Sequence, residues 1–599
     1  MKIKSIILLL VIMTFNIVSC DEFLKEELVS DVPASSYYTT PAAFEDAVKA
    51  TYFYMKYIYS NERAYTLTVF GTDTYTNGAD GNHKGFNTYD NTLNSANGVM
   101  TEMWQFLYKG INQANAVISL SETINGLNPT TLTIRVAEAR FLRALYYFTL
   151  ARQWGDVHLT LKATEGAQSE ANKTPQLEIY SKAIIPDLEF AIANLPNTQA
   201  DYGRATKPAA QHLLGLALLT RGYTSFAATN DFSKAEGYFS NVINDYSFKL
   251  VSDMISLWNQ GNQKNSEVIF AVQNSVNALL NGGEVGGTPG EGNRGHLYFL
   301  MQYDDTGMKR DIANGRPFKR FRPTNYLLNL WGANRDNDKR YQDTYKHAWI
   351  SNITPADVNS TPKWAQENVD VGAKKKDGSL VTAADIGKFK YSEGDTAIYI
   401  PGPGKETKFL TKAGKLGVRY RVYTRTAAYT GDPLVYSEAR FAHTSKFIDP
   451  LRPSIQWMEG SRDWVVMRLA DTYLLRAEAR FKQGNTGGAA IDINAVRTRA
   501  AWPGKETNMQ IAGGAVTTDF ILDERARELD AEQCRWYDLT RMLTPQQFVD
   551  RVKLYNPQAA PNVKVHQIRR PIPQIQIDRT LPAGSYVQNC GYPGGPACN

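Results

Sequence analysis

Three glutamates spaced four residues apart are the feature of this sequence that could most directly carry acid–base chemistry. They fall on one face of a predicted helix and are Glu524, Glu528 and Glu532. Two carboxylates held this close could serve as the acid and the nucleophile of a glycoside hydrolase. Three arginines accompany them, Arg525, Arg527 and Arg535. Because guanidinium partners keep carboxylates ionised and so disable a general acid, we predict a structural salt-bridge network.

Other signatures of catalysis are absent from the sequence. It has no Gly-x-Ser-x-Gly, His-Glu-x-x-His or Cys-x-x-Cys motif, and neither Pro-Gly-Lys run continues into the serine or threonine of a phosphate-binding loop. The seven histidines are scattered without the spacing of zinc ligands. We therefore predict a protein that is not an enzyme, with no cofactor and no metal.

Two runs of alternating oxygen-bearing side chains stay open as calcium loops, residues 73–80 and 334–338. Tyr75 interrupts the first run, and Lys339 takes the place of the required glycine after the second. We interpret both as Asx-rich turns, with bound calcium as the alternative.

The N-terminus predicts a signal peptide over residues 1–19, with Lys2 and Lys4 before an apolar stretch. Ser19 followed by Cys20 resembles the bacterial lipobox, in which the cysteine becomes the lipidated mature N-terminus. An ordinary cleavage site with an unmodified Cys20 is the alternative. Later apolar stretches are too broken by polar residues to span a bilayer, so we expect membrane attachment through lipid alone.

Charge and composition exclude several classes of protein. Of 66 Lys and Arg, two lie in the signal peptide, which leaves 64 against 60 Asp and Glu. This near-neutral balance over 599 residues does not predict nucleic-acid binding, which requires clustered positive charge. Four cysteines exclude a disulfide-built scaffold, although Cys590 and Cys598 flank a turn-forming run that could bring them together. The 33 tyrosines suit surfaces that must both pack and hydrogen-bond.

Hydrophobic periodicity predicts a mainly α-helical fold with tetratricopeptide-like repeats that support a loop-rich second half. The predicted helices cover residues 42–58, 100–122 and 132–154, and two helix pairs cover 206–226 with 232–245 and 464–483 with 487–499. Between about 265 and 460 the helical period disappears, and residues 281–295 are rich in glycine. We expect a helical region over 20–264 and a loop-rich ligand-binding region with C-terminal helices over 265–599, packed as one unit.

Four stretches of the sequence resemble the SusD/RagB family, the nutrient-binding lipoproteins of the Bacteroidetes outer membrane. They are AEARFLRALYYF at 137–148 leading into Gly-Asp at 155–156, MRLADTYLLRAEA at 467–479 with INAVR at 493–497, ILDERARELDAE at 521–532, and PIP at 571–573 with QNCGY at 588–592. Cys590 stands where the family usually has proline, which favours its disulfide with Cys598. The loop-rich middle matches the family weakly.

This resemblance implies a binding protein that caps a TonB-dependent, SusC-like transporter of the outer membrane and delivers a glycan to it. The RagB branch implies a peptide instead, and we keep peptide capture as the alternative. The acidic residues directly after Cys20 resemble those of lipoproteins exported to the cell exterior. The alternative is that they belong to a solvated linker whose charge is incidental.

Sugar recognition requires aromatic rings for the axial C–H groups and polar side chains for the hydroxyls. Two segments combine both, residues 73–89 and 326–349. The predicted ligand-binding residues are Tyr75, Asp80, His83, Tyr89, Trp331, Asn334, Arg335 and Tyr341. Trp331 is the strongest of them, because it is expected to end a short helix and to project at a loop.

Overall fold

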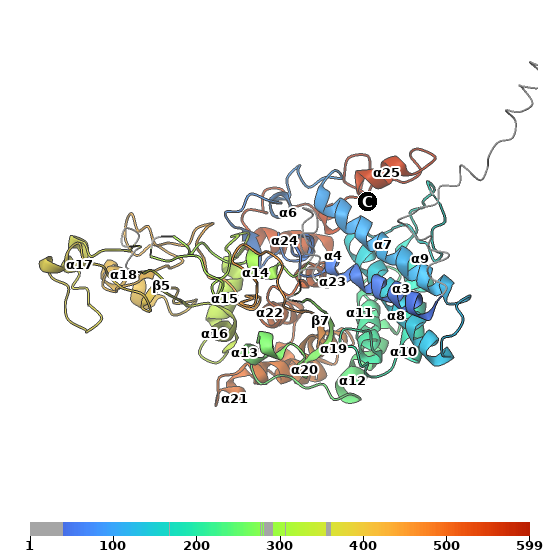
Figure 1. The fold of residues 1–599 in the computed structure, drawn as a ribbon, viewed down its shortest axis with the longest axis horizontal. Coiled ribbons are helices and arrows are strands. Elements are labelled where there is room, and N and C mark those ends of the chain that lie inside the picture. The colour runs from blue at the N-terminus through green and yellow to red at the C-terminus, as the bar shows by residue number, and fades with distance from the viewer. Residues whose placement is uncertain are drawn as a thin grey trace, which may run out of the picture.

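The computed structural model describes residues 40–166, 168–275, 277, 280, 292–305, 307–354, 357 and 361–598. The predicted signal peptide and Cys20 lie outside the described residues, as do residues 281–291 of the glycine-rich run. The fold is mainly helical, as the periodicity predicted (Figure 1).

The N-terminal part contains α3 (Pro41–Phe53), α4 (Met55–Ile58), α5 (Glu62–Thr68), β1 (Tyr75–Asn77), α6 (Gly85–Thr88), α7 (Gly98–Leu120), α8 (Pro129–Trp154), α9 (Gln176–Ile179), η1 (Tyr180–Ile184), α10 (Ile185–Asn194), α11 (Lys207–Arg221) and α12 (Asp231–Asn244). The middle part contains α13 (Met254–Leu257), η2 (Gln260–Asn262), β2 (Val268–Val272), α14 (Gly295–Tyr298), β3 (Phe321–Pro323), α15 (Asn325–Ala333), α16 (Arg340–Thr344), β4 (Ala348–Ile350), α17 (Gln366–Asp370), η4 (Ala383–Asp385), β5 (Thr396–Tyr399), η5 (Thr407–Phe409), α18 (Lys412–Leu416), β6 (Arg421–Val422) and β7 (Trp464–Arg468). The C-terminal part contains α19 (Leu469–Lys482), α20 (Thr486–Ala500), α21 (Glu506–Met509), η6 (Gly513–Ala515), α22 (Thr518–Glu528), α23 (Arg535–Met542), α24 (Pro545–Tyr555), η7 (Val565–Ile568) and α25 (Gln574–Arg579).

The longer helices form one stacked array. Along it α3 packs on α7, α7 on α8, α8 on α10, α10 on α11 and α11 on α12. The array then passes from α12 to α19 and α20, although residues 245–468 intervene in the sequence. Each helix covers its neighbour's apolar face, so the repeats bury together what none could bury alone.

Helix α8 shows how local sequence sets the boundaries of an element. Asn128 caps its first turn, where the Oδ1 atom accepts hydrogen bonds from the amides of Thr130 and Thr131. The helix ends at Gly155, whose φ of +83° is costly for residues with a Cβ. The predicted end of this helix at Gly155 is confirmed.

The predicted helix over 464–483 begins too early. Residues Trp464–Arg468 form strand β7, which pairs antiparallel with β2, and α19 starts only at Leu469. Aromatic and β-branched residues such as Trp464 and Val465 favour a strand once a partner strand is available. Two further small sheets join β1 with β3, and β4 with β5 and β6.

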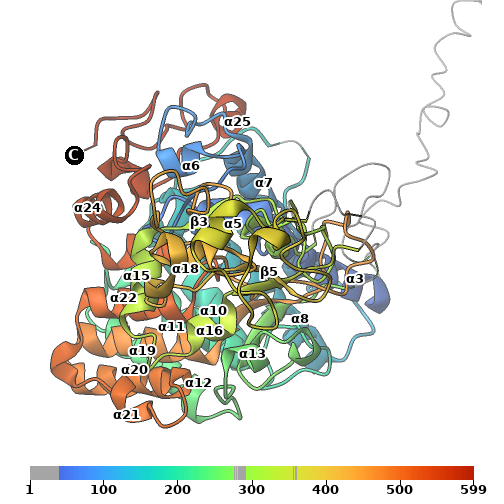
Figure 2. The ribbon, with the colours of Figure 1, turned by 90° about the vertical axis from the view of Figure 1, so that its left-hand side faces the viewer.

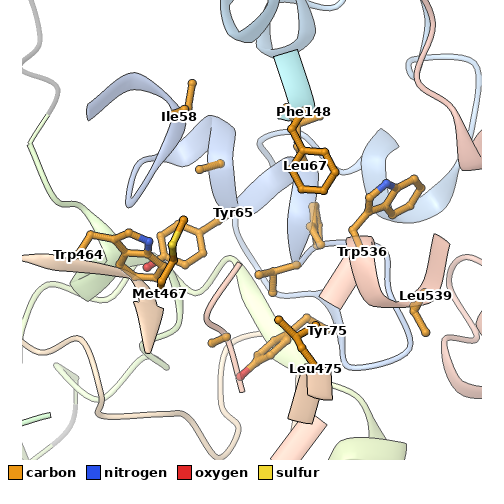
Figure 3. Close-up of a cluster of buried hydrophobic side chains, with 14 of the residues drawn as sticks. Ile58, Tyr65, Leu67, Tyr75, Phe148, Trp464, Met467, Leu475, Trp536 and Leu539 are labelled. Carbon is orange, nitrogen blue, oxygen red and sulfur yellow. The ribbon is translucent and has the colours of Figure 1, made fainter. Parts of the chain in front are cut away.

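One large core connects the helical array with the C-terminal helices. Figure 3 shows part of it, where Tyr65 of α5, Phe148 of α8, Trp464 of β7 and Trp536 of α23 gather although they are far apart in the sequence. All four side chains are buried. One contiguous core therefore contains side chains of both the helical array and the C-terminal helices.

The segment with α17, β5 and α18 projects from the body at the left of Figure 1, and Figure 2 views it end on. Trp364, Ala373 and Val381 form a small separate core in this projection. Near the C-terminus Cys590 and Cys598 form a disulfide with Cα atoms 5.0 Å apart. None of the described helices combines the length and apolar composition of a membrane span.

Candidate functional site

Four of the eight residues predicted to bind ligand are buried. The exposed fraction is 1% for Tyr75, 3% for Tyr89, 2% for Trp331 and 1% for Tyr341. Trp331 does not project at a loop as expected; its ring packs at 5.9 Å from Tyr341 and 6.0 Å from Tyr345. These rings fill the core and offer no face to a ligand.

The remaining four predicted residues divide into two groups. Asp80 accepts a hydrogen bond from Arg320 at 2.9 Å, while His83 and Arg320 both contact Glu62. Asn334 and Arg335 lie beyond α15, where the Arg335 guanidinium is 4.3 Å from the Tyr341 ring. Asp80 and His83 are thus linked through Arg320 and Glu62, and Arg335 joins Trp331 through Tyr341, whereas Asn334 contacts Asn337 and Met509.

A cavity of about 720 Å³ lies beside α15, and the two predicted segments both line it, but with other side chains. Thr76 reaches it from the first segment, next to the buried Tyr75. Tyr326 and Asn329 reach it from the second, on a different face of α15 from Trp331. Other lining residues are Arg322, Asn325, Arg425, Tyr436, Asp523, Tyr555 and Gln558.

Two tyrosines form an aromatic wall of this cavity. The rings of Tyr326 and Tyr555 stack with centroids 4.1 Å apart and an interplanar angle of 28°. The Tyr326 hydroxyl donates to Asp523 and accepts from Arg551. Burial raises the pKa of Tyr326 above its ordinary value, so the hydroxyl stays protonated. Tyr326 is therefore fixed, whereas Tyr555 remains half-buried at the cavity surface.

Polar side chains surround the aromatic wall. Arg425 donates to Asn329 at 2.7 Å and pairs with Glu406 at 2.8 Å. The Arg322 side chain makes one hydrogen bond in the described part of the chain, from Nε to the backbone oxygen of Asn77 at 3.1 Å. Its remaining guanidinium N–H groups can donate to a ligand in the cavity.

Three further side chains are exposed or half-buried at this cavity. Asn325 and Asn329 are exposed on α15, and their amides both donate and accept hydrogen bonds. Gln558 is half-buried, and its Oε1 accepts from Thr76 at 2.7 Å. The cavity therefore combines an aromatic surface with neutral amides and a guanidinium, which suits a polyhydroxylated ligand.

Sequence reasoning missed Tyr555, Tyr436, Arg322 and Arg425 as lining residues. Tyr555 ends α24, which was not among the predicted helices, and Tyr436 and Arg425 lie in the loop-rich middle. No motif marks them, because only the fold brings α15, α24 and residues 425–436 to one cavity. Tyr326 lies within a predicted segment, but nothing in its spacing separated it from Trp331.

Glu524 and Glu528 lie on α22 in a buried ion network, as predicted, but the helix ends at Glu528, so Glu532 joins the network from the turn that follows, and most partners differ from those expected. Glu524 pairs with Arg340, Arg497 and Arg527, Glu528 with Arg340, Arg468 and Arg499, and Glu532 with Arg468 and Lys446. Arg525 and Arg535 pair instead with aspartates. Burial opposes ionisation, yet the arginines outweigh it and hold the pKa of Glu528 at about 2. Such a carboxylate cannot act as a general acid near neutral pH.

The carboxylates of the two Asx-rich runs have cationic partners. Asp73 accepts from Arg535 at 2.7 Å and from Arg551 at 2.6 Å, and these arginines hold its pKa below the ordinary value against the effect of burial. Asp338 pairs with Arg340 at 2.6 Å. Across the described residues, no group of three or more His, Cys, Asp or Glu could hold a metal ion.

Comparison with known proteins assigns the chain to a family. The model of the SusD family matches residues 266–592, and a model described as "starch-binding associating with outer membrane" matches residues 22–223. The chain is 23% identical over 556 residues to SusD-like protein P2 of Formosa agariphila, which covers 90% of each chain. It is 25% identical over 443 residues to the starch-binding protein SusD of Bacteroides thetaiotaomicron, covering 73% of this chain and 69% of that protein.

Solved structures show the same fold. A laminarin-binding SusD-like protein superimposes with a TM-score of 0.63 at 21% identity, over 93% of this chain and 100% of that one. Surface glycan-binding protein A of Bacteroides fluxus superimposes with a TM-score of 0.61 at 16% identity, over 92% and 100%. With a family model that matches more than half of its length, the chain belongs to the SusD family.

Proposed function

We propose that the protein captures a glycan and that the sugar binds in the cavity lined by Tyr326 and Tyr555. The observation that carries this proposal is the stacked tyrosine pair beside exposed amides and a guanidinium. Relatives named for starch and laminarin binding support the same ligand class. A volume of about 720 Å³ is that of a typical small-ligand site.

The chemistry of the cavity fits binding rather than hydrolysis. The axial C–H groups of a sugar ring pack on an aromatic face, and its hydroxyls bond to amides such as Asn325 and Asn329. Glycoside hydrolysis needs two carboxyl groups that flank the scissile bond. Asp523 is the one carboxylate among the lining residues, and it already accepts hydrogen bonds from Tyr326 and Arg551.

We also propose that the protein is anchored in the outer membrane through lipid on Cys20, faces the exterior and delivers its glycan to a TonB-dependent, SusC-like transporter. The lipobox-like sequence and the description of the second family model support this placement. Replacing Cys20 with alanine should abolish acylation and release the protein from membranes. Membrane association that persists in this variant without the transporter would contradict the anchor.

The ligand class is tested with the soluble chain from residue 21 onward. The protein is screened against neutral oligo- and polysaccharides, and against a peptide library of matched size. We expect saturable binding to at least one glycan, measured by calorimetry, and none to the peptides. Binding to peptides alone would replace the glycan by the peptide function, and binding to neither would remove the proposal.

A further inference from the structure

A second cavity, of about 540 Å³, lies between the helical array and the junction of α23 and α24. Its lining includes four cationic side chains, Arg152, Lys482, Arg541 and Arg569, and no aspartate or glutamate. It shares no lining residue with the cavity of Tyr326 and Tyr555. We propose that this second cavity binds an oxyanion, a sulfate, phosphate or carboxylate group, carried by a molecule of about monosaccharide size.

Arg152 lines this cavity as a cation without an anionic partner among the described residues. Its guanidinium lies between two rings, 4.1 Å from Phe148 and 3.6 Å from Tyr537. Within the described part of the chain its side chain forms no ion pair and no hydrogen bond, and its Nε is buried without a partner. A buried donor left unpaired costs free energy, which a ligand oxygen in this cavity would recover.

Arg569 is a second cation of this cavity that has few partners. The one hydrogen bond of its guanidinium among the described residues runs from Nη1 to the backbone oxygen of Arg152, at 3.2 Å. Both guanidiniums line this cavity, and neither forms an ion pair in the described part of the chain, although the more distant Asp156 acts electrostatically on Arg569. Burial lowers the pKa of Arg569, which reports the cost of keeping this cation out of water. An anion in this cavity would offset part of the desolvation cost of Arg569.

The other cations have different roles. Arg541 is already paired with Glu478 at 2.8 Å and with Asp538 at 2.9 Å, so it adds little net charge. Lys482 is exposed at the rim, with Nζ 4.7 Å from the Tyr223 ring. It can reach an anion without prior loss of a salt bridge.

Neutral groups around the cavity complete the site. The first turn of α24 contributes Thr544, Pro545 and Gln547 to the lining, which places the positive end of an 11-residue helix at the cavity. The hydroxyl groups of Thr224 and Thr540 donate instead to the backbone oxygens of Arg221 and Trp536. Arginines and a helix N-terminus are groups that recognise oxyanions in proteins.

The test is calorimetry on the soluble chain from residue 21, in a buffer of low ionic strength without phosphate or sulfate. The probes are inorganic sulfate, inorganic phosphate and glucuronate, which distinguish a free ion from a sugar acid, with glucose as the neutral control. We expect one saturable site for at least one anion, weakened by added sodium chloride because salt screens the attraction. Absence of saturable binding by all three anions would overturn the proposal.

Variants assign the binding to this cavity. Arg569→Gln and Lys482→Glu should each raise the dissociation constant of the anion by about tenfold or more. This is the effect of losing one charged contact of about 1.4 kcal/mol. Arg140→Gln is the control for loss of a positive charge, because Arg140 lies outside the cavity, stacked on Phe190 at 4.4 Å and 3.4 Å from Asp187. Lys482→Glu changes an exposed side chain, so it tests the site even where Arg569→Gln fails to fold.

Two outcomes would contradict the assignment. Anion affinity unchanged in both cavity variants would place the anion elsewhere. Loss of anion binding in Tyr555→Ala, with full binding in Lys482→Glu, would place it in the first cavity. Glycan binding should be intact in Lys482→Glu, so failure of this inference is distinguishable from failure of the proposed function.

Discussion

Tyr326 and Tyr555 stack across the boundary between two helices that are far apart in the sequence, α15 and α24. Hydrogen bonds with Asp523 and Arg551 hold the hydroxyl of the inner ring, Tyr326. The outer ring, Tyr555, lies at the end of its helix and is half-buried. A fixed ring thus supports an accessible one, and this arrangement keeps an aromatic surface in place before any ligand arrives.

Tyr555→Ala should weaken glycan binding and leave the fold largely intact. By analogy with other aromatic stacking contacts, the loss should be about 1–3 kcal/mol. This corresponds to a roughly 5- to 150-fold rise in the dissociation constant, measured by calorimetry with a glycan that the screen identifies. Lys553→Ala, on the exposed side of the same helix, is the control. Equal affinities in wild type and Tyr555→Ala would move the sugar site away from this cavity.

Trp331→Ala should lower the stability of the fold and leave glycan affinity unchanged, the reverse of Tyr555→Ala. Its side chain is buried against Tyr341 and Tyr345, so its removal leaves a void in the core. We expect a loss of about 3–5 kcal/mol in the free energy of unfolding, measured by chemical denaturation, with glycan affinity retained in the folded fraction. A stable variant with weakened binding would restore Trp331 to the ligand site.

Glu528→Gln should destabilise the protein strongly. The carboxylate is fully buried and accepts hydrogen bonds from Arg340 at 3.0 Å and Arg468 at 2.7 Å. Because a neutral side chain leaves these guanidiniums buried with too little negative charge, we expect a loss of about 3–5 kcal/mol. Glu102→Gln, which breaks an exposed pair with Arg63, should cost less than about 1 kcal/mol. Similar melting temperatures for wild type and Glu528→Gln would contradict a stabilising network.

Mild acid should destabilise the protein through buried histidines. Burial lowers the pKa of His212 from the ordinary value of 6.5 to about 4, and also lowers that of His347 and His443 to about 4. The unfolded chain therefore takes up protons between pH 6.5 and 4 that the folded chain does not. The stability that these histidines contribute is fully present above pH 6.5 and is lost as the pH falls toward 4.

His212→Gln tests this origin of the acid sensitivity. The glutamine retains a polar group near Thr472, to which His212 Nδ1 is hydrogen-bonded at 2.9 Å, but it cannot titrate. Denaturation by urea at pH 7.5, 6.0 and 5.0 should show a shallower loss of stability with falling pH in the variant. An identical pH dependence in both proteins would mean that other groups cause it.

Local sequence was sufficient for most helices of the array. The apolar period of α8 and the glycine at 155 define an element within its own residues, so no distant contact is needed to predict it. The spacing of Glu524, Glu528 and Glu532 likewise predicted an ion network. It could not name Arg340, Arg468 and Arg499 as partners, because these arginines come from segments that only folding brings to the helix.

The composition of the candidate site depended on tertiary structure. The sequence selected residues 73–89 and 326–349, and both line the cavity, but through Thr76, Tyr326 and Asn329 instead of Tyr75 and Trp331. Spacing determines which residues of a helix or strand share a face, since this follows from the backbone repeat. Which face is buried depends on the neighbours that pack against it, and α15 carries aromatic or aliphatic residues on more than one face. Tyr341 and Tyr345 cover Trp331, and only the folded chain places them there.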